Sequence, residues 1–253
     1  MRVAEGERRA VPPPAAGREV QRLSRAVDSM RRQLEGRPFV ETFSADLSHE
    51  LKNPVAAIRA SAEVLADGAL DEPEEAARFV GRIREATGRI EALLGDLLSL
   101  ARIEARGVED AAVIDLAELT QQAAARARDR GSIVELSRTS SAMVKGDAGW
   151  LARAVDNLLD NARTHGETPT SPIKVELGRA EGQVTLAVRN QGRVVKHVEK
   201  RLFRRFVTTR ADRGGTGLGL AIVRAVAEAH SGSAECTVLG PPEVEFRITL
   251  PAA

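Results

Sequence analysis

The sequence predicts an α + α/β protein in which an antiparallel helical hairpin precedes a mixed α/β region. Apolar residues recur at steps of three and four through residues 39–65 and again through 76–103, as in long amphipathic helices. Beyond Gly107, short apolar runs typical of strands alternate with helical segments. A second domain is therefore predicted over residues 112–253.

The hairpin is predicted over residues 39–106. Asp67-Gly68 is expected to end the first helix, and Asp71-Glu72-Pro73 is predicted to be a turn that places acids near the start of the second. One hairpin cannot cover both apolar stripes, so pairing with a second copy as a four-helix bundle, a homodimer, is expected. The stripes comprise Phe39, Phe43, Leu47, Leu51, Val55, Ile58, Ala62 and Leu65, then Ala76, Phe79, Val80, Ile83, Thr87, Ile90, Leu93, Leu94, Leu97, Leu100, Ala101 and Ile103.

The segment before the hairpin divides in two. Residues 1–17 are charged or rich in Pro, Ala and Gly, which predicts a flexible arm. Residues 18–38 show helical spacing, which predicts a signalling helix or linker. In the second domain, helices are predicted over 116–130, 150–165 and 218–229, and strands over 133–136, 173–177, 184–188, 235–238 and 244–250.

Composition narrows the function classes. A net charge of +1 and an aromatic content of 3% argue against a nucleic-acid partner. Cys236 is the only cysteine, so no intrachain disulfide can form and a reducing compartment fits. No apolar run approaches the roughly 18 residues that span a bilayer. A cytoplasmic chain is expected, and a membrane anchor upstream of it stays open.

The first candidate reactive group is His49, which lies five residues before Pro54 in a predicted helix. Proline in a helix interior removes a backbone N–H and costs about 3 kcal/mol, so a compensating role is expected. Asp46 and Asn53 share the helix face of His49, and Glu50 flanks it. A plain surface histidine in a coiled coil is the alternative for an isolated His-Glu pair. Two further histidines, His165 and His230, are expected to be structural or peripheral.

Two asparagines in the second domain, Asn157 and Asn161, are four residues apart and share a helix face. Asparagine is unfavourable in a helix interior, and its amide oxygen is a ligand for a hard cation such as Mg²⁺. A polar, solvated helix face is an equally acceptable reading of this segment alone.

A glycine-rich run leads directly into a predicted apolar helix. Small residues let a phosphate approach the backbone, and a helix N-terminus supplies N–H donors. Flexible turns have the same appearance, so the run by itself is weak evidence. It comprises Gly215, Thr216, Gly217, Leu218 and Gly219.

These segments, together with Asn190-Gln191-Gly192 and a Phe-Arg-Arg-Phe run at 203–206, resemble the H, N, G1, F and G2 boxes of sensor histidine kinases. The catalytic domain of that family belongs to the GHKL ATPase superfamily. The resemblance covers residues 39–251 in the expected order. It implies an α/β-sandwich ATP-binding domain behind a dimerisation and phosphotransfer hairpin.

The resemblance also implies roles for individual residues. His49 would take a phosphoryl group from ATP and pass it to an aspartate of a response-regulator receiver domain. Glu50 would be the acidic partner of His49, although spacing alone also allows Asp46. Asn53 would position a water for the reverse phosphatase reaction. The residues implied for ATP and Mg²⁺ are Asn157, Asn161, Asn190, Gly192, Arg205, Gly215, Thr216, Gly217, Leu218 and Gly219, with the two N-box asparagines at the metal.

The sequence departs from the family pattern at three positions. Asn190 replaces the aspartate that reads the adenine amine, Val194 replaces a glycine, and Thr164 replaces a basic residue. The Asn190 amide can accept from adenine, or donate to O6 of guanine, and both alternatives stay open. The departures at Asn190 and Val194 argue for an alternative function, a degenerate pseudokinase acting as a dimeric regulator-binding scaffold, whereas the intact H-box and the pair of N-box asparagines argue against it. A mismatch-repair or chaperone ATPase would leave the His49 hairpin unexplained.

Overall fold

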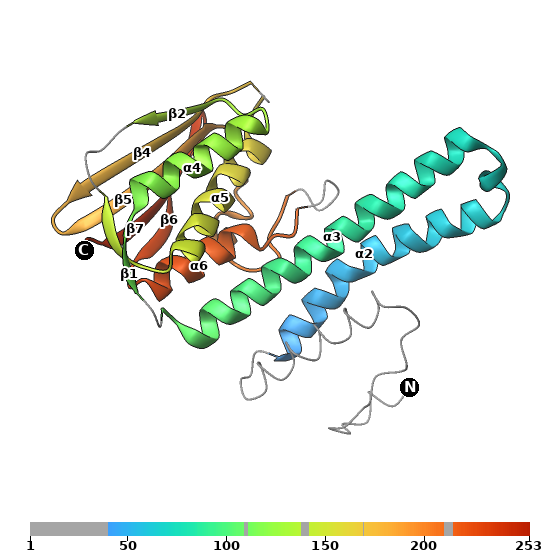
Figure 1. The fold of residues 1–253 in the computed structure, drawn as a ribbon, viewed down its shortest axis with the longest axis horizontal. Coiled ribbons are helices and arrows are strands. Elements are labelled where there is room, and N and C mark those ends of the chain that lie inside the picture. Colours follow the sequence, from blue (N-terminus) through green and yellow to red (C-terminus); the bar gives the residue numbers. More distant parts are fainter. Residues whose placement is uncertain (1–39, 109–110, 138–141, 169, 210–214) are drawn as a thin grey trace. The chain divides into compact units, whose positions relative to one another are not determined.

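The computed structural model describes residues 40–108, 111–137, 142–168, 170–209 and 215–253 (Figure 1). The side chains of residues 40–46 are not among those described. The predicted arm at 1–17 and linker helix at 18–38 lie outside the described residues. So do Arg213 and Gly214, which precede the glycine-rich run.

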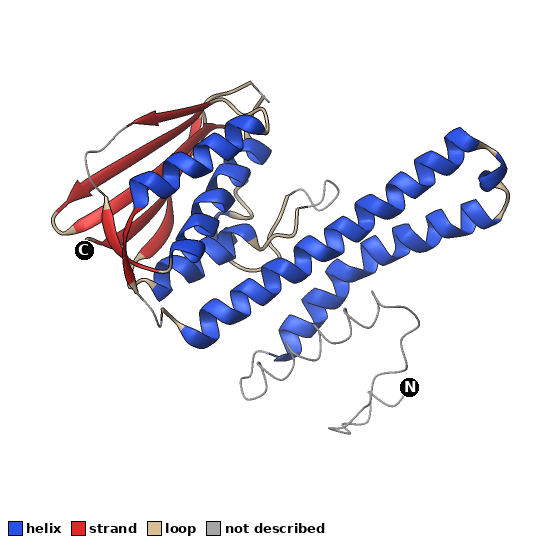
Figure 2. Ribbon diagram, viewed as in Figure 1, coloured by secondary structure: helices blue, strands red, loops and turns tan. Residues whose placement is uncertain are grey.

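The helical hairpin is present, as predicted. Helix α2 spans Val40–Ala66, a short 3₁₀ turn η1 spans Ala69–Asp71, and helix α3 spans Pro73–Arg106 (Figure 2). Helix α2 continues through Pro54. Pro73 occupies the first turn of α3, where its missing N–H costs nothing, and the N–H of Gly107 bonds to the carbonyl of Ile103 at the other end.

The hairpin buries only part of its apolar surface. Phe79, Leu93 and Leu97 of α3 are buried, whereas the side chains of Val55 and Val80 are 51% and 45% exposed. Both exposed valines belong to the predicted apolar stripes. Among the residues that the structure describes, no helix is both long and apolar enough to cross a bilayer.

The second domain is an α/β sandwich, as predicted. Its five-stranded sheet has the order β2-β4-β5-β7-β6, with β2 and β4 parallel and the other neighbours antiparallel. Three helices cover one face of this sheet (Figure 1). The strands are β2 Val134–Ser137, β4 Ile173–Ala180, β5 Gln183–Gln191, β6 Ser233–Leu239 and β7 Glu243–Pro251, and the helices are α4 Leu116–Asp129, α5 Ala148–His165 and α6 Gly219–Ala229.

The core lies between the helices and the sheet. Alternate residues of β7, including Val244, Phe246 and Ile248, are buried toward the helices. Polar residues lie between them on the other face, where Glu245 is also buried and pairs with Arg189 and Arg247. The alternation of apolar and polar residue types is what predicts β7 from the sequence.

A buried histidine fixes the relative position of the two helices that flank the site. His230, just after α6, donates from Nδ1 to the carbonyl of Val226 at 2.7 Å and accepts at Nε2 from the backbone N–H of Asp147 at 3.0 Å. Burial lowers the pKa of His230 and so favours the neutral ring that this pattern requires. A Cβ at Gly146 would overlap the ring. His230 is therefore structural, as expected.

Two features were not predicted from the sequence. Strands β1 Ala112–Asp115 and β3 Met143–Gly146 form a separate antiparallel pair. They are four residues long and β1 is largely exposed, so they carry little periodic signal. Helix α5 begins two residues earlier than predicted because the Asp147 side chain accepts from the N–H of Trp150 and caps it.

Candidate active site

The predicted reactive histidine lies on the surface of α2. His49 and Asn53 are exposed and one helical turn apart, while Glu50 is partly buried beside them. Asp46, the second candidate carboxylate, has no described side chain. An exposed imidazole on a regular helix is accessible to a large substrate, which an ordinary core histidine such as His230 is not.

Helix α5 brings the two asparagines to the inner part of the site. Asn161 lines a pocket of the second domain. The amide nitrogen of Asn157 is buried and has no hydrogen-bond partner among the described residues. A buried polar group without a partner costs about 1–3 kcal/mol, so this nitrogen is suited to a ligand. The side-chain oxygens of Asn157 and Asn161 are of the kind that Mg²⁺ takes as ligands.

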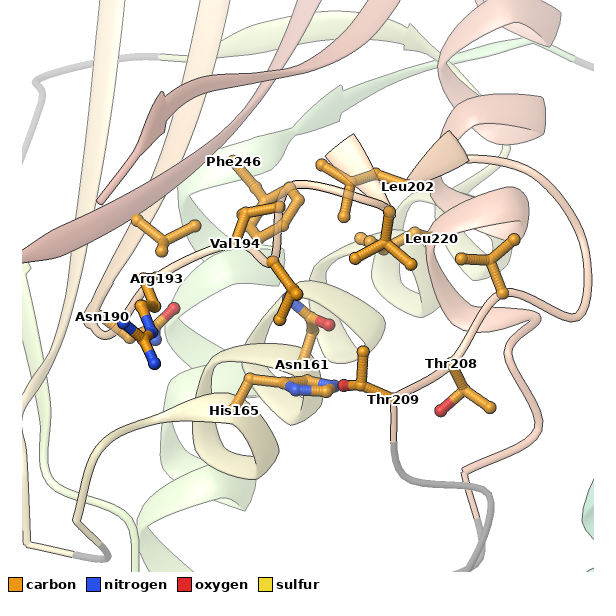
Figure 3. Close-up of a pocket in the computed structure, with 14 residues that line it drawn as sticks. Asn161, His165, Asn190, Arg193, Val194, Leu202, Thr208, Thr209, Leu220 and Phe246 are labelled. Carbon is orange, nitrogen blue, oxygen red and sulfur yellow. The ribbon is translucent and has the colours of Figure 1, made fainter. Parts of the chain in front are cut away.

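The pocket has an apolar wall and a polar edge (Figure 3). Asn161 and His165 project into it from α5, and Asn190 and Arg193 line it at the end of β5. This combination suits a flat, partly apolar ligand with a few polar groups. The apolar wall comprises Val194, Val195, Val198, Leu202, Val207, Leu220, Val244 and Phe246.

Asn190 is 4% exposed, and its side-chain nitrogen donates to the carbonyl of Gln191 at 2.9 Å. Its side-chain oxygen is the acceptor that remains for other partners. Gly192 follows with a φ of 152°, and its N–H bonds to the carbonyl of Pro242 at 2.8 Å. A Cβ at Gly192 would lie 3.1 Å from the carbonyl oxygen of His165, so glycine suits this close approach.

The glycine-rich run packs against the Phe-Arg-Arg-Phe segment. Gly217 has a φ of 65°, and a Cβ there would lie 2.7 Å from the backbone carbon of Phe206. At Gly219 the corresponding Cβ would meet Asn157 at an ordinary 3.8 Å. The run thus links the start of α6 to Asn157 on one side and to Phe206 on the other.

Of the ten predicted ligand-binding residues, only Asn161 and Asn190 are among the described residues that line this pocket. Gly215 and Thr216 line a smaller pocket with Glu50, Asn53, Pro54, Arg89 and Leu93. Arg205 forms an ion pair with Glu104 of α3. The predicted site residues that line pockets therefore fall in two of them, one within the α/β domain and one against the hairpin.

The sequence reasoning missed four polar residues of the pocket, His165, Arg193, Thr208 and Thr209. His165 was expected to be structural or peripheral, and the structure places it in the lining of the pocket. Its position four residues after Asn161, hence on the same helix face, was the available signal. Arg193 had no comparable signal, since a single arginine in a loop is ordinary.

The two glycines of the run make a matched pair of substitutions. Gly217→Ala is expected to destabilise the domain by about 1–3 kcal/mol because it adds backbone strain and a contact with Phe206. Gly219→Ala is expected to change the free energy of unfolding by less than about 0.5 kcal/mol or to stabilise α6. Chemical denaturation of both variants tests this. Equal losses would contradict the role assigned to the Gly217 conformation.

Comparisons with known proteins agree with this geometry. Residues 39–106 match the His Kinase A (phospho-acceptor) domain, and residues 146–253 match the histidine kinase-, DNA gyrase B- and HSP90-like ATPases. The signal transduction histidine-protein kinase/phosphatase MprB of Mycobacterium sp. (strain KMS) is 38% identical over 250 residues, which cover 92% of this chain and 48% of MprB. The chain thus spans about half the length of this relative.

Solved structures show the same fold. Full-length ShkA in complex with AMPPNP is 27% identical with a TM-score of 0.58, over 83% of this chain and 45% of that one. Histidine kinase ThkA in complex with the response regulator TrrA is 19% identical with a TM-score of 0.67, over 94% of this chain and 68% of that one. With both domains matched in order, the chain belongs to the sensor histidine kinases.

Proposed function

We propose that this chain is a kinase core that transfers the γ-phosphoryl group of ATP to His49. One observation carries the proposal: an exposed histidine beside Glu50 on α2 occurs in the same chain as a pocket lined by Asn161 and Asn190. The family relationship supports it. The relatives compared are named as kinases, which gives no support to the pseudokinase alternative.

The nucleotide is proposed to bind between α5, the end of β5 and the glycine-rich run. Asn157 and Asn161 would hold Mg²⁺ and phosphate oxygens, which is consistent with the buried amide nitrogen of Asn157. When bound, Mg²⁺ neutralises charge on the phosphates. Gly215, Gly217 and Gly219 would let the triphosphate approach the backbone. The base would lie against the apolar wall near Asn190.

The proposed reaction is a direct displacement at the γ-phosphorus of ATP. A neutral ring nitrogen of His49 attacks the γ-phosphorus, and the bond from that phosphorus to the bridging oxygen breaks, so ADP leaves with the bonding electrons. The other ring nitrogen carries a proton, which Glu50 holds or accepts. Asp46 stays an alternative for this carboxylate. Phosphohistidine would then donate its phosphoryl group to an aspartate of a receiver domain.

His49 is predicted to be the sole phosphorylated histidine. After incubation with radiolabelled ATP and Mg²⁺, acid-labile label should be lost in His49→Ala because no other ring nitrogen is placed beside the H-box acid. His197→Ala is the matched control, since His197 is also exposed and belongs to no proposed site. Label in His49→Ala at the wild-type level would show that His49 is not the nucleophile.

The receiver domain of a response regulator is the proposed phosphoryl acceptor, and the protein is proposed to dephosphorylate that regulator as well. MprB is named a kinase/phosphatase, and the ThkA structure contains a regulator.

A second copy of this chain is proposed to cover the exposed valines of the hairpin. Sedimentation equilibrium tests this by measuring the mass of the assembly in solution. We place this core in the cytoplasm, with any membrane anchor in an upstream segment.

Asn53 is predicted to serve dephosphorylation more than phosphorylation. It lies one turn from His49, is exposed, and has an amide that can orient a water but no titratable proton. In Asn53→Ala, phosphorylated regulator should persist at least several-fold longer while His49 still accepts label. A parallel loss of both activities would instead give Asn53 a structural role.

Asn190 is predicted to accept a hydrogen bond from the adenine amine. Its amide oxygen can accept from that amine, whereas one of the two hydrogens of its amide nitrogen already donates to the carbonyl of Gln191 and only the second could meet O6 of guanine. Calorimetry should show preference for ATP over GTP, and Asn190→Asp should tighten ATP by about tenfold through a charge-assisted bond.

The control for that experiment is Gln191→Glu, which adds the same charge one residue away at an exposed position. It should leave ATP affinity unchanged. Equal binding of ATP and GTP by the wild-type chain would restore the guanine alternative. Unchanged ATP affinity in Asn190→Asp would show that this residue does not read the base.

A further inference from the structure

Two carboxylates of α3 hold polar groups of the proposed nucleotide site. Asp96 accepts from Arg153 Nη2 at 2.6 Å through one oxygen and from Thr216 Oγ1 at 2.9 Å through the other. Glu104 forms an ion pair with Arg205. Both carboxylates belong to the hairpin, and all three of their partners belong to the α/β domain.

Each partner belongs to a different segment of the nucleotide site. Arg153 lies one turn before Asn157 on α5, Arg205 lies in the Phe-Arg-Arg-Phe segment, and Thr216 lies within the glycine-rich run. Helix α3 also packs against α6, which begins at the end of that run. The two carboxylates are eight residues apart, a little over two turns of the same helix.

These contacts are sheltered from solvent more than ordinary surface pairs. The side chains of Asp96 and Arg205 are 20% and 19% exposed. Exposed i,i+4 pairs such as Arg59 with Glu63 are 81% and 60% exposed. Charges that are partly removed from water attract and repel more strongly. Asp96 and Glu104 would therefore repel an anion that binds at the glycine-rich run.

The carboxylates and a triphosphate are alternative partners for the same groups. The Thr216 hydroxyl has one proton, which it donates either to Asp96 or to a phosphate oxygen. While Arg205 is paired with Glu104, the carboxylate offsets its positive charge, so that Arg205 attracts a phosphate less strongly. The Thr216 oxygen also accepts from the N–H of Leu218 at 3.3 Å, so moving this hydroxyl moves the backbone of the run.

We propose that Asp96 and Glu104 are positioning residues that oppose nucleotide binding by holding Thr216, Arg153 and Arg205 on α3. The proposal rests on the proposed function, since it requires that phosphates of ATP bind at the run. By linkage, the nucleotide then weakens the contact between the α/β domain and α3 to the same degree as that contact weakens the nucleotide.

The test uses the full chain with the isosteric variants Glu104→Gln and Asp96→Asn. The affinities for ATP with Mg²⁺ and for adenosine are measured by calorimetry, and stability is measured by thermal unfolding without nucleotide. Each variant should bind ATP up to about fivefold more tightly, the factor that a partly exposed ion pair supports. Adenosine affinity should not change, and the unfolding midpoint should stay equal or fall.

Glu91→Gln is the matched control, because it removes the same charge from an exposed position of α3. It should leave ATP affinity unchanged. Wild-type ATP affinity in Glu104→Gln and Asp96→Asn would overturn the proposal, as would weaker binding in parallel with lower stability. Equal tightening for adenosine or in Glu91→Gln would also overturn it. If the wild-type chain fails to bind ATP, the proposed function itself fails.

Discussion

The buried ring of His230 joins the end of α6 to the start of α5, and the position of the site depends on this junction. One ring nitrogen bonds to the Val226 carbonyl and the other to the Asp147 N–H, while Gly146 leaves room for the ring. Loss of either bond would leave a buried polar group unpaired, at a cost of about 1–3 kcal/mol. The helix carrying the two asparagines and the helix following the glycine-rich run are thereby held in one arrangement.

Around this junction, the pocket proposed to hold the base has no carboxylate among its described lining residues, and the carboxylate contacts lie toward the hairpin. Asn190 places an amide where the related proteins' pattern places a carboxylate, so the base end carries less negative charge. The carboxylates instead lie on α3, where Asp96 and Glu104 meet Arg153, Thr216 and Arg205. The balance between these contacts and phosphate binding would couple catalysis to the hairpin.

Much of the fold could be predicted because apolar residues recur along the sequence at the spacing of helices or strands. The turn that joins the hairpin helices, from Gly68 to Pro73, follows from its turn residues. Strand β7 follows from the spacing of its apolar side chains. Strands β1 and β3 were not predicted because four residues are too few to establish a period, and β1 has no buried residue. Asp46 remains an untested alternative to Glu50, because its side chain is not described.

The sequence by itself determined which chemical groups are present and in what order: the His49 segment, the Asn157 and Asn161 pair, and the glycine-rich run. Each is a short motif whose spacing places its members on one helix face or turn. Only the tertiary structure decided that His165 lines the pocket, that the Asn190 nitrogen is committed to a carbonyl, and that Asp96 reaches Thr216, 120 residues away. Such pairings depend on how helices and strands pack, and no local pattern encodes them.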